Sequence, residues 1–192
     1  MQRISTVDRC VDSRMMRRIL AAVDQSPYAY AVFRRAIELT KLLNSELTVL
    51  SVVNSNPMMI TSLRDELGKL AGFHRELVFK NFPAESVKME SNPGHGTLFR
   101  CGPGGELRIH SRIENGDPVD VICRCAQETD ADLVIVGSRG LGNVGALVLG
   151  SVSEKVVRKS TRTVMVVKDV TSGNSDWEKI GNAPKATQHL TR

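Results

Sequence analysis

Three glycines and two serines near residue 140 form a segment that suits the binding of an anion. A β-branched run ends at Gly137, Gly140 follows, and Gly150 comes after a nine-residue loop. Glycines let backbone N–H groups approach a ligand because they carry no Cβ atom. A helix predicted to begin near Gly150 would add unpaired N–H donors, and Ser151 and Ser153 would add hydroxyls. We therefore predict an anion site, best suited to phosphate.

Other interpretations of this segment remain open. The same composition is common in flexible surface turns, and Ser151 would serve equally as a simple helix N-cap. Residues 140–145 spell G-x-G-x-x-G, but a dinucleotide fingerprint belongs at the first strand–helix turn, and here only one strand is predicted to follow. Residues 145–150 have the glycine spacing of a P-loop, but Ser151 and Val152 replace its Lys and Ser/Thr pair, which disfavours a Walker NTPase.

A strand and a helix must hold the two ends of this loop. Residues 132–136 form an apolar, β-branched run, which is typical of a parallel strand covered on both faces. From residue 151, apolar residues at 152, 156 and 157 follow a helical period, and Ser151 with Glu154 resembles a capping box. The loop is thus expected to connect the carboxyl end of a strand to the start of a helix.

The rest of the chain alternates between strands and helices. Strands are predicted at 17–24, 46–53 and 163–167, and helices at 27–43, 59–80 and from 118 onward. Ser26 with Pro27 is expected to cap the first helix, Asn44 to end it, and Asp117 to cap the helix from Pro118. The third strand is either 85–90 or 106–113, and we prefer the second because its residues alternate cleanly.

Three segments are predicted to lie outside the regular elements. Residues 1–16 form a disordered arm, 169–192 form a disordered polar tail, and 91–105 form a flexible insertion with five glycines and two prolines. A single nucleotide-binding domain is left at residues 17–168. Translation from Met15 or Met16 instead of Met1 stays an open alternative.

Composition favours one globular domain. The chain has 192 residues, of which 41% are hydrophobic, enough to bury a core. Its formal net charge is +5, but 26 basic and 21 acidic residues are interspersed and only 4% of residues are aromatic. We expect no nucleic-acid binding, because there is no basic block and no stacking surface. We expect no membrane span either, since no apolar run reaches the required length of about 20 residues.

The cysteines and histidines do not suggest a metal site. Four cysteines in a chain without a secretory signal are expected to be reduced, which places the protein in the cytoplasm. Cys123 and Cys125 lie two apart on a predicted helix, so they point to different faces. His74 is interpreted as a surface histidine or a hydrogen-bonded helix histidine, because no second histidine shares its face.

Five strands alternating with four helices predict an α/β fold, an open doubly wound parallel sheet with helices on both faces. In such sheets a ligand binds at the carboxyl ends of the strands, where the strand order reverses.

The spacing Gly137-x2-Gly140-x9-Gly150-Ser resembles that of the ATP-binding universal stress proteins, and the resemblance extends from Arg17 to Lys168. It implies a five-stranded sheet of order 3-2-1-4-5 in the adenine nucleotide alpha hydrolase-like fold. The order would reverse between the first and fourth strands, so residues near 24 and 137 would share one site.

The resemblance also implies the roles of individual site residues. Asp24 would lie at the adenosine and Val52 would line the base pocket, while Ala22 stands where the family often has proline. Without the family, Asp24 would equally be a turn residue before Ser26. Arg139 would add charge, although a solvated loop arginine is its simpler role. The glycine motif would surround the ribose and phosphates with Gly137, Gly140, Gly150, Ser151, Val152 and Ser153.

The function implied is that of an ATP-binding stress-response or signalling regulator. ADP, AMP and an accompanying Mg²⁺ are alternatives for the ligand. No base or nucleophile is set beside the phosphates, so we expect no catalytic residues and at most slow hydrolysis. A slow ATPase or phosphotransfer enzyme, and a nucleotide-free interaction module, remain the alternatives.

The last predicted strand, 163–167, is expected to be an apolar sheet edge and to form a homodimer. The alternative is that the tail folds back over this edge.

Overall fold

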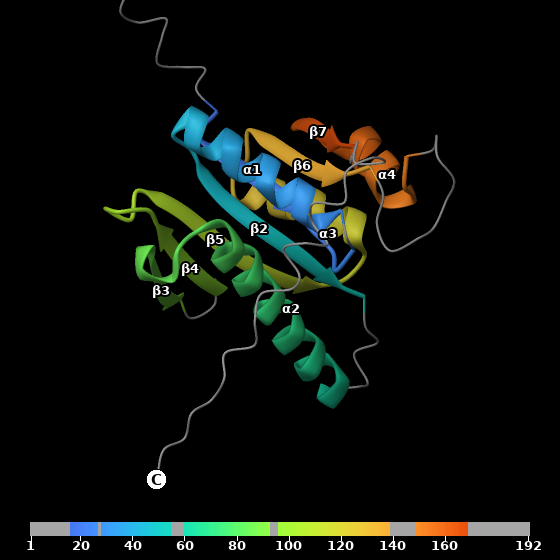
Figure 1. Ribbon diagram of the computed structural model, residues 1–192. Helices are drawn as coiled ribbons and strands as arrows, with labels where there is room; N and C mark the ends of the chain where they lie inside the picture. Colours follow the sequence, from blue (N-terminus) through green and yellow to red (C-terminus); the bar gives the residue numbers. More distant parts are fainter. Residues whose placement is uncertain (1–15, 27, 55–59, 93–95, 139–148, 169–192) are drawn as a thin grey trace, which may run out of the picture.

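The computed structural model describes residues 16–26, 28–54, 60–92, 96–138 and 149–168 (Figure 1). The elements are β1 (Arg18–Ala22), α1 (Ala29–Leu43), β2 (Glu46–Val53), α2 (Ile60–Asn81), a short 3-10 helix (Ala84–Ser86), β3 (Val87–Asn92), β4 (Gly96–Cys101), β5 (Leu107–Asn115), α3 (Pro118–Glu128), β6 (Leu133–Gly137), α4 (Ser151–Lys159) and β7 (Thr163–Val167). The predicted arm and tail lie outside these residues, apart from Met16, whose carbonyl accepts a hydrogen bond from Ser45.

The α/β class is confirmed, but the described sheet has seven strands in the order β3-β4-β5-β2-β1-β6-β7, not five. Five of them, β5, β2, β1, β6 and β7, are parallel and follow the expected 3-2-1-4-5 order. The order reverses between β1 and β6, which pair through Ile19–Leu133, Leu20–Val134 and Ala21–Ile135. The carboxyl ends of these two strands therefore lie side by side.

The extra strands correct the prediction of a flexible insertion at 91–105. β3 and β4 form an antiparallel hairpin, and β4 pairs with β5. Several glycines serve the strand ends: Gly96 has φ +86°, and a Cβ there would lie 2.0 Å from the carbonyl oxygen of Ser111. Both candidates for the third strand are strands, the preferred one as parallel β5 and the other as the antiparallel edge β3.

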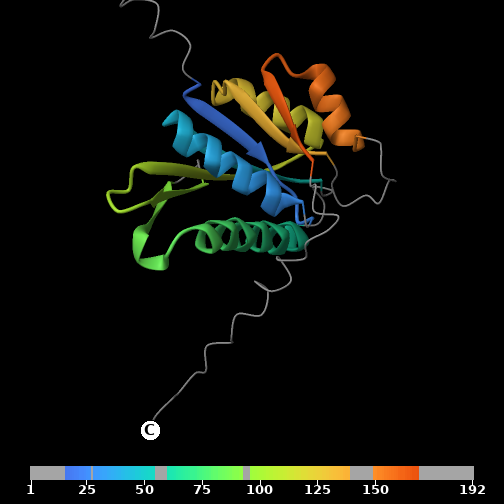
Figure 2. The same cartoon turned by 45° about the horizontal axis from the view of Figure 1, so that its top comes forward.

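Helices cover both faces of the sheet, α1 and α2 on one and α3 and α4 on the other (Figure 2). Because side chains alternate along a strand, β1, β2, β6 and β7 each contribute residues to two cores. Val49 and Ile135 join Phe33 of α1 in the first core, whereas Leu50 and Val134 join α3 in the second.

Two of the predicted helix boundaries are confirmed and one is wrong. Asn44 ends α1 in the left-handed conformation, with φ 50°. Asp117 caps α3, since its carboxylate accepts hydrogen bonds from the N–H groups of Val119 (2.9 Å) and Asp120 (3.1 Å). Ser26 does not cap α1, which begins at Ala29, and Pro27 lies outside the described residues.

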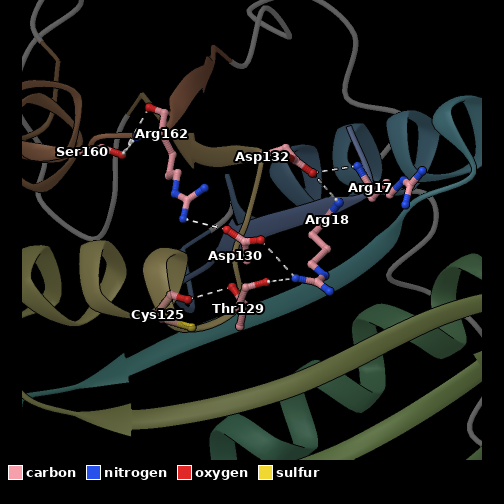
Figure 3. Close-up of polar contacts among 8 residues, drawn as sticks. All are labelled: Arg17, Arg18, Cys125, Thr129, Asp130, Asp132, Ser160 and Arg162. Atoms are coloured by element: carbon pink, nitrogen blue, oxygen red, sulfur yellow. Dashed lines mark hydrogen bonds and ion pairs between the residues drawn. The ribbon is translucent and has the colours of Figure 1, made fainter. Parts of the chain in front are cut away.

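Polar contacts connect the amino-terminal ends of the parallel strands, at the end of the sheet opposite the predicted site (Figure 3). The Asp132 carboxylate, just before β6, accepts hydrogen bonds from the backbone N–H groups of Arg17 (2.7 Å) and Arg18 (3.0 Å) at the start of β1. Asp130 forms ion pairs with Arg18 (3.5 Å) and Arg162 (2.9 Å). These contacts fix β1 next to β6 and so help to set the register that positions their carboxyl ends.

Candidate functional site

The first part of the site is the turn that follows β1. One carboxylate oxygen of Asp24 accepts hydrogen bonds from the backbone N–H of Ser26 (3.1 Å) and from its hydroxyl (2.5 Å). Ser26 is buried, so its hydroxyl is committed to Asp24 instead of capping α1. This closed turn fixes the half-buried Asp24 side chain at the carboxyl edge of the sheet.

The second part is the end of β6, where three hydrogen bonds hold the described ends of the glycine-rich loop. The N–H of Ser138 donates to the carbonyl of Val167 in β7 (2.8 Å), and the N–H of Gly150 donates to the carbonyl of Ser138 (2.8 Å). The Ser153 hydroxyl donates to the carbonyl of Gly137 (2.5 Å). The start of α4 is thus fixed directly onto the end of β6.

The predicted capping box at this helix start is wrong. Gly150 is the N-cap, with φ −60° and ψ 149°, and no side chain there accepts a capping hydrogen bond. The Glu154 carboxylate instead pairs with Arg158 (2.9 Å), one turn further along the helix. Ser151 is exposed. The first turn of α4 therefore presents N–H groups that no described side chain caps, which is the arrangement expected at an anion site.

The apolar part of the predicted site also comes together. Ala22 at the end of β1, Val52 near the end of β2 and Val152 in α4 are half-buried and pack against the same hydrophobic core. They come from three elements that converge at the carboxyl edge. Half-buried apolar side chains at such an edge suit contact with a flat apolar group such as a base.

Sequence reasoning missed a charged group beside Val52. Glu114 of β5 is paired with Val52 in the sheet register. Its carboxylate forms ion pairs with Arg112 (2.5 Å) and Arg124 (2.6 Å), and its side chain is 17% exposed. The ion pair between Glu114 and Arg124 joins β5 to α3. It depends on how the two elements pack, so no local sequence pattern could predict it.

A second missed feature is a buried polar chain below the end of β1. The His74 ring of α2 lies between two serine hydroxyls, with Nε2 2.8 Å from Ser51 Oγ and Nδ1 2.8 Å from Ser111 Oγ. The Ser51 hydroxyl donates to the carbonyl of Val23 (2.7 Å), the residue before Asp24. Burial lowers the pKa of His74 to about 4, so the ring is neutral at pH 7. Of the two interpretations of His74, the hydrogen-bonded helix histidine is confirmed, and the surface histidine is wrong because the residue is 2% exposed.

Arg139 and Gly140 lie outside the described residues, so their expected contacts with phosphate stay predictions. The parts of the site that are described come from β1, β2, β6 and α4, and they combine backbone donors, a fixed carboxylate and an apolar surface. Such a set can bind an anionic ligand that carries an apolar ring.

The described residues also bear on metal binding, thiol chemistry and membrane crossing. Among the described residues, no group of three or more His, Cys, Asp or Glu side chains is placed to hold a metal ion. Cys101, Cys123 and Cys125 are buried free thiols, and burial raises the pKa of each, to about 11 for Cys101 and Cys125. None of the described helices combines the length and the apolar character needed to cross a membrane.

Comparison with known sequences identifies a family. The sequence model of the universal stress protein family matches residues 15–168. A Staphylococcus saprophyticus protein named as a universal stress protein is 32% identical over 151 residues, which cover 78% of this chain and 82% of the relative. A protein of the same designation from Staphylococcus aureus strain USA300 is 31% identical over 153 residues, or 79% of this chain and 84% of the relative.

Solved structures share the fold. The protein MJ0577 superposes with a TM-score of 0.61 at 24% identity, covering 83% of this chain and 100% of its own. The universal stress protein UspA of Lactobacillus plantarum gives 0.59 at 21% identity, with 80% and 99% coverage. A universal stress protein in complex with cAMP gives 0.55 at 21% identity, with 81% and 98% coverage.

Proposed function

Because the chain belongs to the universal stress protein family, we propose that it binds an adenine nucleotide, ATP first, across the carboxyl ends of β1 and β6. Binding would serve regulation in the cytoplasm under stress, with at most slow hydrolysis. The ligand would stabilise one conformation or assembly of the protein. ADP and AMP are the alternative ligands, and Mg²⁺ would accompany the phosphates.

The observation that carries the proposal is the set of hydrogen bonds that connects the end of β6 to the start of α4. Gly150 donates its N–H to Ser138, and Ser153 ties the first turn of the helix to Gly137. These hydrogen bonds hold the uncapped helix start in place beside the strand end. A preformed set of backbone donors binds phosphate without paying to order the loop ends.

The adenosine end of the ligand is assigned to the other half of the site. The half-buried side chains of Ala22 and Val52 would contact the base, and the Asp24 carboxylate would accept hydrogen bonds from the base or the ribose. Gly137 would lie against the ribose. Nucleotide binding within this fold is supported by the relative that was solved in complex with cAMP.

A regulatory role is preferred over an enzymatic one because of what the site offers. The described donors are backbone N–H groups and the Ser151 hydroxyl, which stabilise charge but do not activate water. One oxygen of the Asp24 carboxylate is already engaged by two hydrogen bonds from Ser26. A slow ATPase is the second candidate, and a nucleotide-free interaction module is the third.

Native mass spectrometry of protein purified without added nucleotide separates these readings. We expect the mass of one adenine nucleotide per chain, and release of ATP or ADP after denaturation. Incubation with ATP should leave most of the ligand unhydrolysed over many minutes. Purified protein that carries no nucleotide and gains none at millimolar ATP would favour the interaction module.

A further inference from the structure

The buried chain Ser111–His74–Ser51 has a direction that its atoms determine. A peptide carbonyl only accepts hydrogen bonds, so Ser51 must give its single proton to Val23, 2.7 Å away. Ser51 then has to accept the Nε2–H of His74, and the Nδ1 of the neutral ring accepts from Ser111. Every donor in this chain therefore points toward β1.

This chain of hydrogen bonds ends at Val23, just after the last residue of β1 that is paired in the sheet. The strand ends at Ala22, and the next residue, Val23, is held to β2 by two separate bonds. Its N–H donates to the Leu50 carbonyl (2.9 Å), and its carbonyl accepts from the Ser51 hydroxyl. A side chain thus replaces the backbone donor that a continued ladder would supply, directly before Asp24.

Burial makes this replacement depend on His74. Ser51, His74 and Ser111 are 1%, 2% and 6% exposed, so water does not satisfy their polar atoms freely. Donors and acceptors that follow one another in a buried chain polarise each other and hold each group in a single orientation. The ring contacts β2 and β5 from α2, and it therefore keeps the Ser51 hydroxyl turned toward Val23.

We propose that His74 is a positioning residue of the nucleotide site, acting through Ser51 to fix the backbone of Val23 and so the place of Asp24. This inference rests on the proposed function, because it gives Asp24 a ligand to meet. The link consists of hydrogen bonds within the protein, so it can be measured without nucleotide.

The two serines provide a matched pair of variants. Both hydroxyls are buried and both lie 2.8 Å from a ring nitrogen of His74, but Ser51 alone of the two reaches Val23. Ser51→Ala should weaken ATP affinity about fivefold, the factor expected when one hydrogen bond that positions the site is lost. Ser111→Ala should stay within about twofold of the wild type, because the contact to Val23 survives.

Variants at the histidine give a second test. His74→Gln keeps an amide N–H for Ser51, whereas His74→Leu fills a similar volume without any donor. We expect Gln to retain most of the ATP affinity and Leu to lose about fivefold, as Ser51→Ala does. Amide hydrogen exchange at Val23 and Ser26 should be faster in Ser51→Ala and His74→Leu, and unchanged in Ser111→Ala and His74→Gln.

The outcomes separate this inference from the proposed function. Equal effects of the two serine variants on exchange and affinity would overturn the link, since a merely structural role predicts equal effects. If wild-type protein binds no ATP, the proposed function fails, and the exchange comparison alone then decides whether His74 positions the end of β1.

Discussion

Two serines in the first turn of α4 carry out different tasks. Ser153 is buried and its hydroxyl donates to Gly137, so it joins the helix to the strand. Ser151 is exposed at the first helical position, where its hydroxyl points at no described partner. In the proposed nucleotide complex, Ser151 would contact phosphate and Ser153 would hold the helix start against β6.

Replacing Ser151 by alanine should therefore weaken ATP binding and leave the fold unchanged. The expected loss is about 1.5–3 kcal/mol, the range for a hydrogen bond to a charged group. Calorimetric titration with ATP measures it, and thermal unfolding provides the control for stability. Ser153→Ala should show a loss of stability instead. A Ser151→Ala variant with wild-type affinity would remove the hydroxyl from the phosphate site.

His74 gives a residue-scale prediction for pH. Its pKa falls from an ordinary 6.5 to about 4 in the folded protein, because burial disfavours the charged ring. A depressed histidine pKa means that the unfolded chain binds the proton first, so the stabilisation is complete above pH 6.5 and is lost as pH falls toward 4. The wild type should lose about 3 kcal/mol more than His74→Gln across that window.

Urea unfolding at steps between pH 7 and pH 4 measures this difference. Carboxylates and His110 titrate in both proteins, so their contributions cancel in the comparison. Parallel stability curves for the wild type and His74→Gln would show that the buried ring is not the source of the pH dependence.

The sequence could identify the types of site residue but not the buried chain of His74. Gly137, Gly150 and Ser151 follow each other closely, and their spacing alone indicates a strand, a loop and a helix start. The contact of His74 with two serines depends on the register that pairs β2 with β5. Nothing local to residue 74 reports that register.

At the scale of elements, the central βα units were predictable and the hairpin was not. β2 and β7 have the predicted bounds, because both are rich in β-branched residues. β4 falls within 91–105, where five glycines and two prolines predict a loop, whereas most of β3 coincides with the alternative strand at 85–90. Gly102 and Gly105 lie in the turn before β5 and have positive φ, and Gly96 starts β4. Glycine there marks tight turns between strands.

The hydrogen bonds of Asp132 at the amino-terminal ends of β1 and β6 provide a prediction about stability. Asp132 accepts two backbone N–H groups from the start of β1, so Asp132→Ala leaves both donors without their partner. We expect a loss of about 1–3 kcal/mol in the free energy of unfolding, measured in urea. Asp130→Asn is the control. The Asp130 side chain is 68% exposed, and exposed ion pairs contribute about 0–1 kcal/mol. Equal losses would refute this assignment.

At the scale of the whole molecule, β7 is an edge strand of the described sheet whose free side needs a partner. It pairs with β6 on one side, and its Val164 and Val166 are half-buried against the second core. Residues 169–192 lie outside the described structure, so their covering the edge stays an alternative. We propose that a second copy pairs with β7 by two-fold symmetry, because an apolar edge is a template for another strand.

Lysine at positions 164 and 166 should convert such a dimer to a monomer, because charged edge residues oppose strand pairing. Light scattering at tens of micromolar measures the mass of the wild type and the double variant. As a control, Lys88→Ala changes an exposed residue at the opposite edge, in β3, and should not alter the mass. A wild type that is already monomeric at this concentration contradicts the interface and turns attention to the tail, with Trp177 as its candidate contact.

Calorimetric titration of ATP into the wild type and Gly150→Val tests the central claim most directly. Gly150 has φ −60° and ψ 149°, which any residue adopts, so the variant should fold while its side chain crowds the helix start. Gly68→Val is the control, since a Cβ at Gly68 meets no atom within 4 Å. The account predicts saturable binding in the wild type and control and none in Gly150→Val. Equal binding in all three proteins, or none in the wild type, would contradict it.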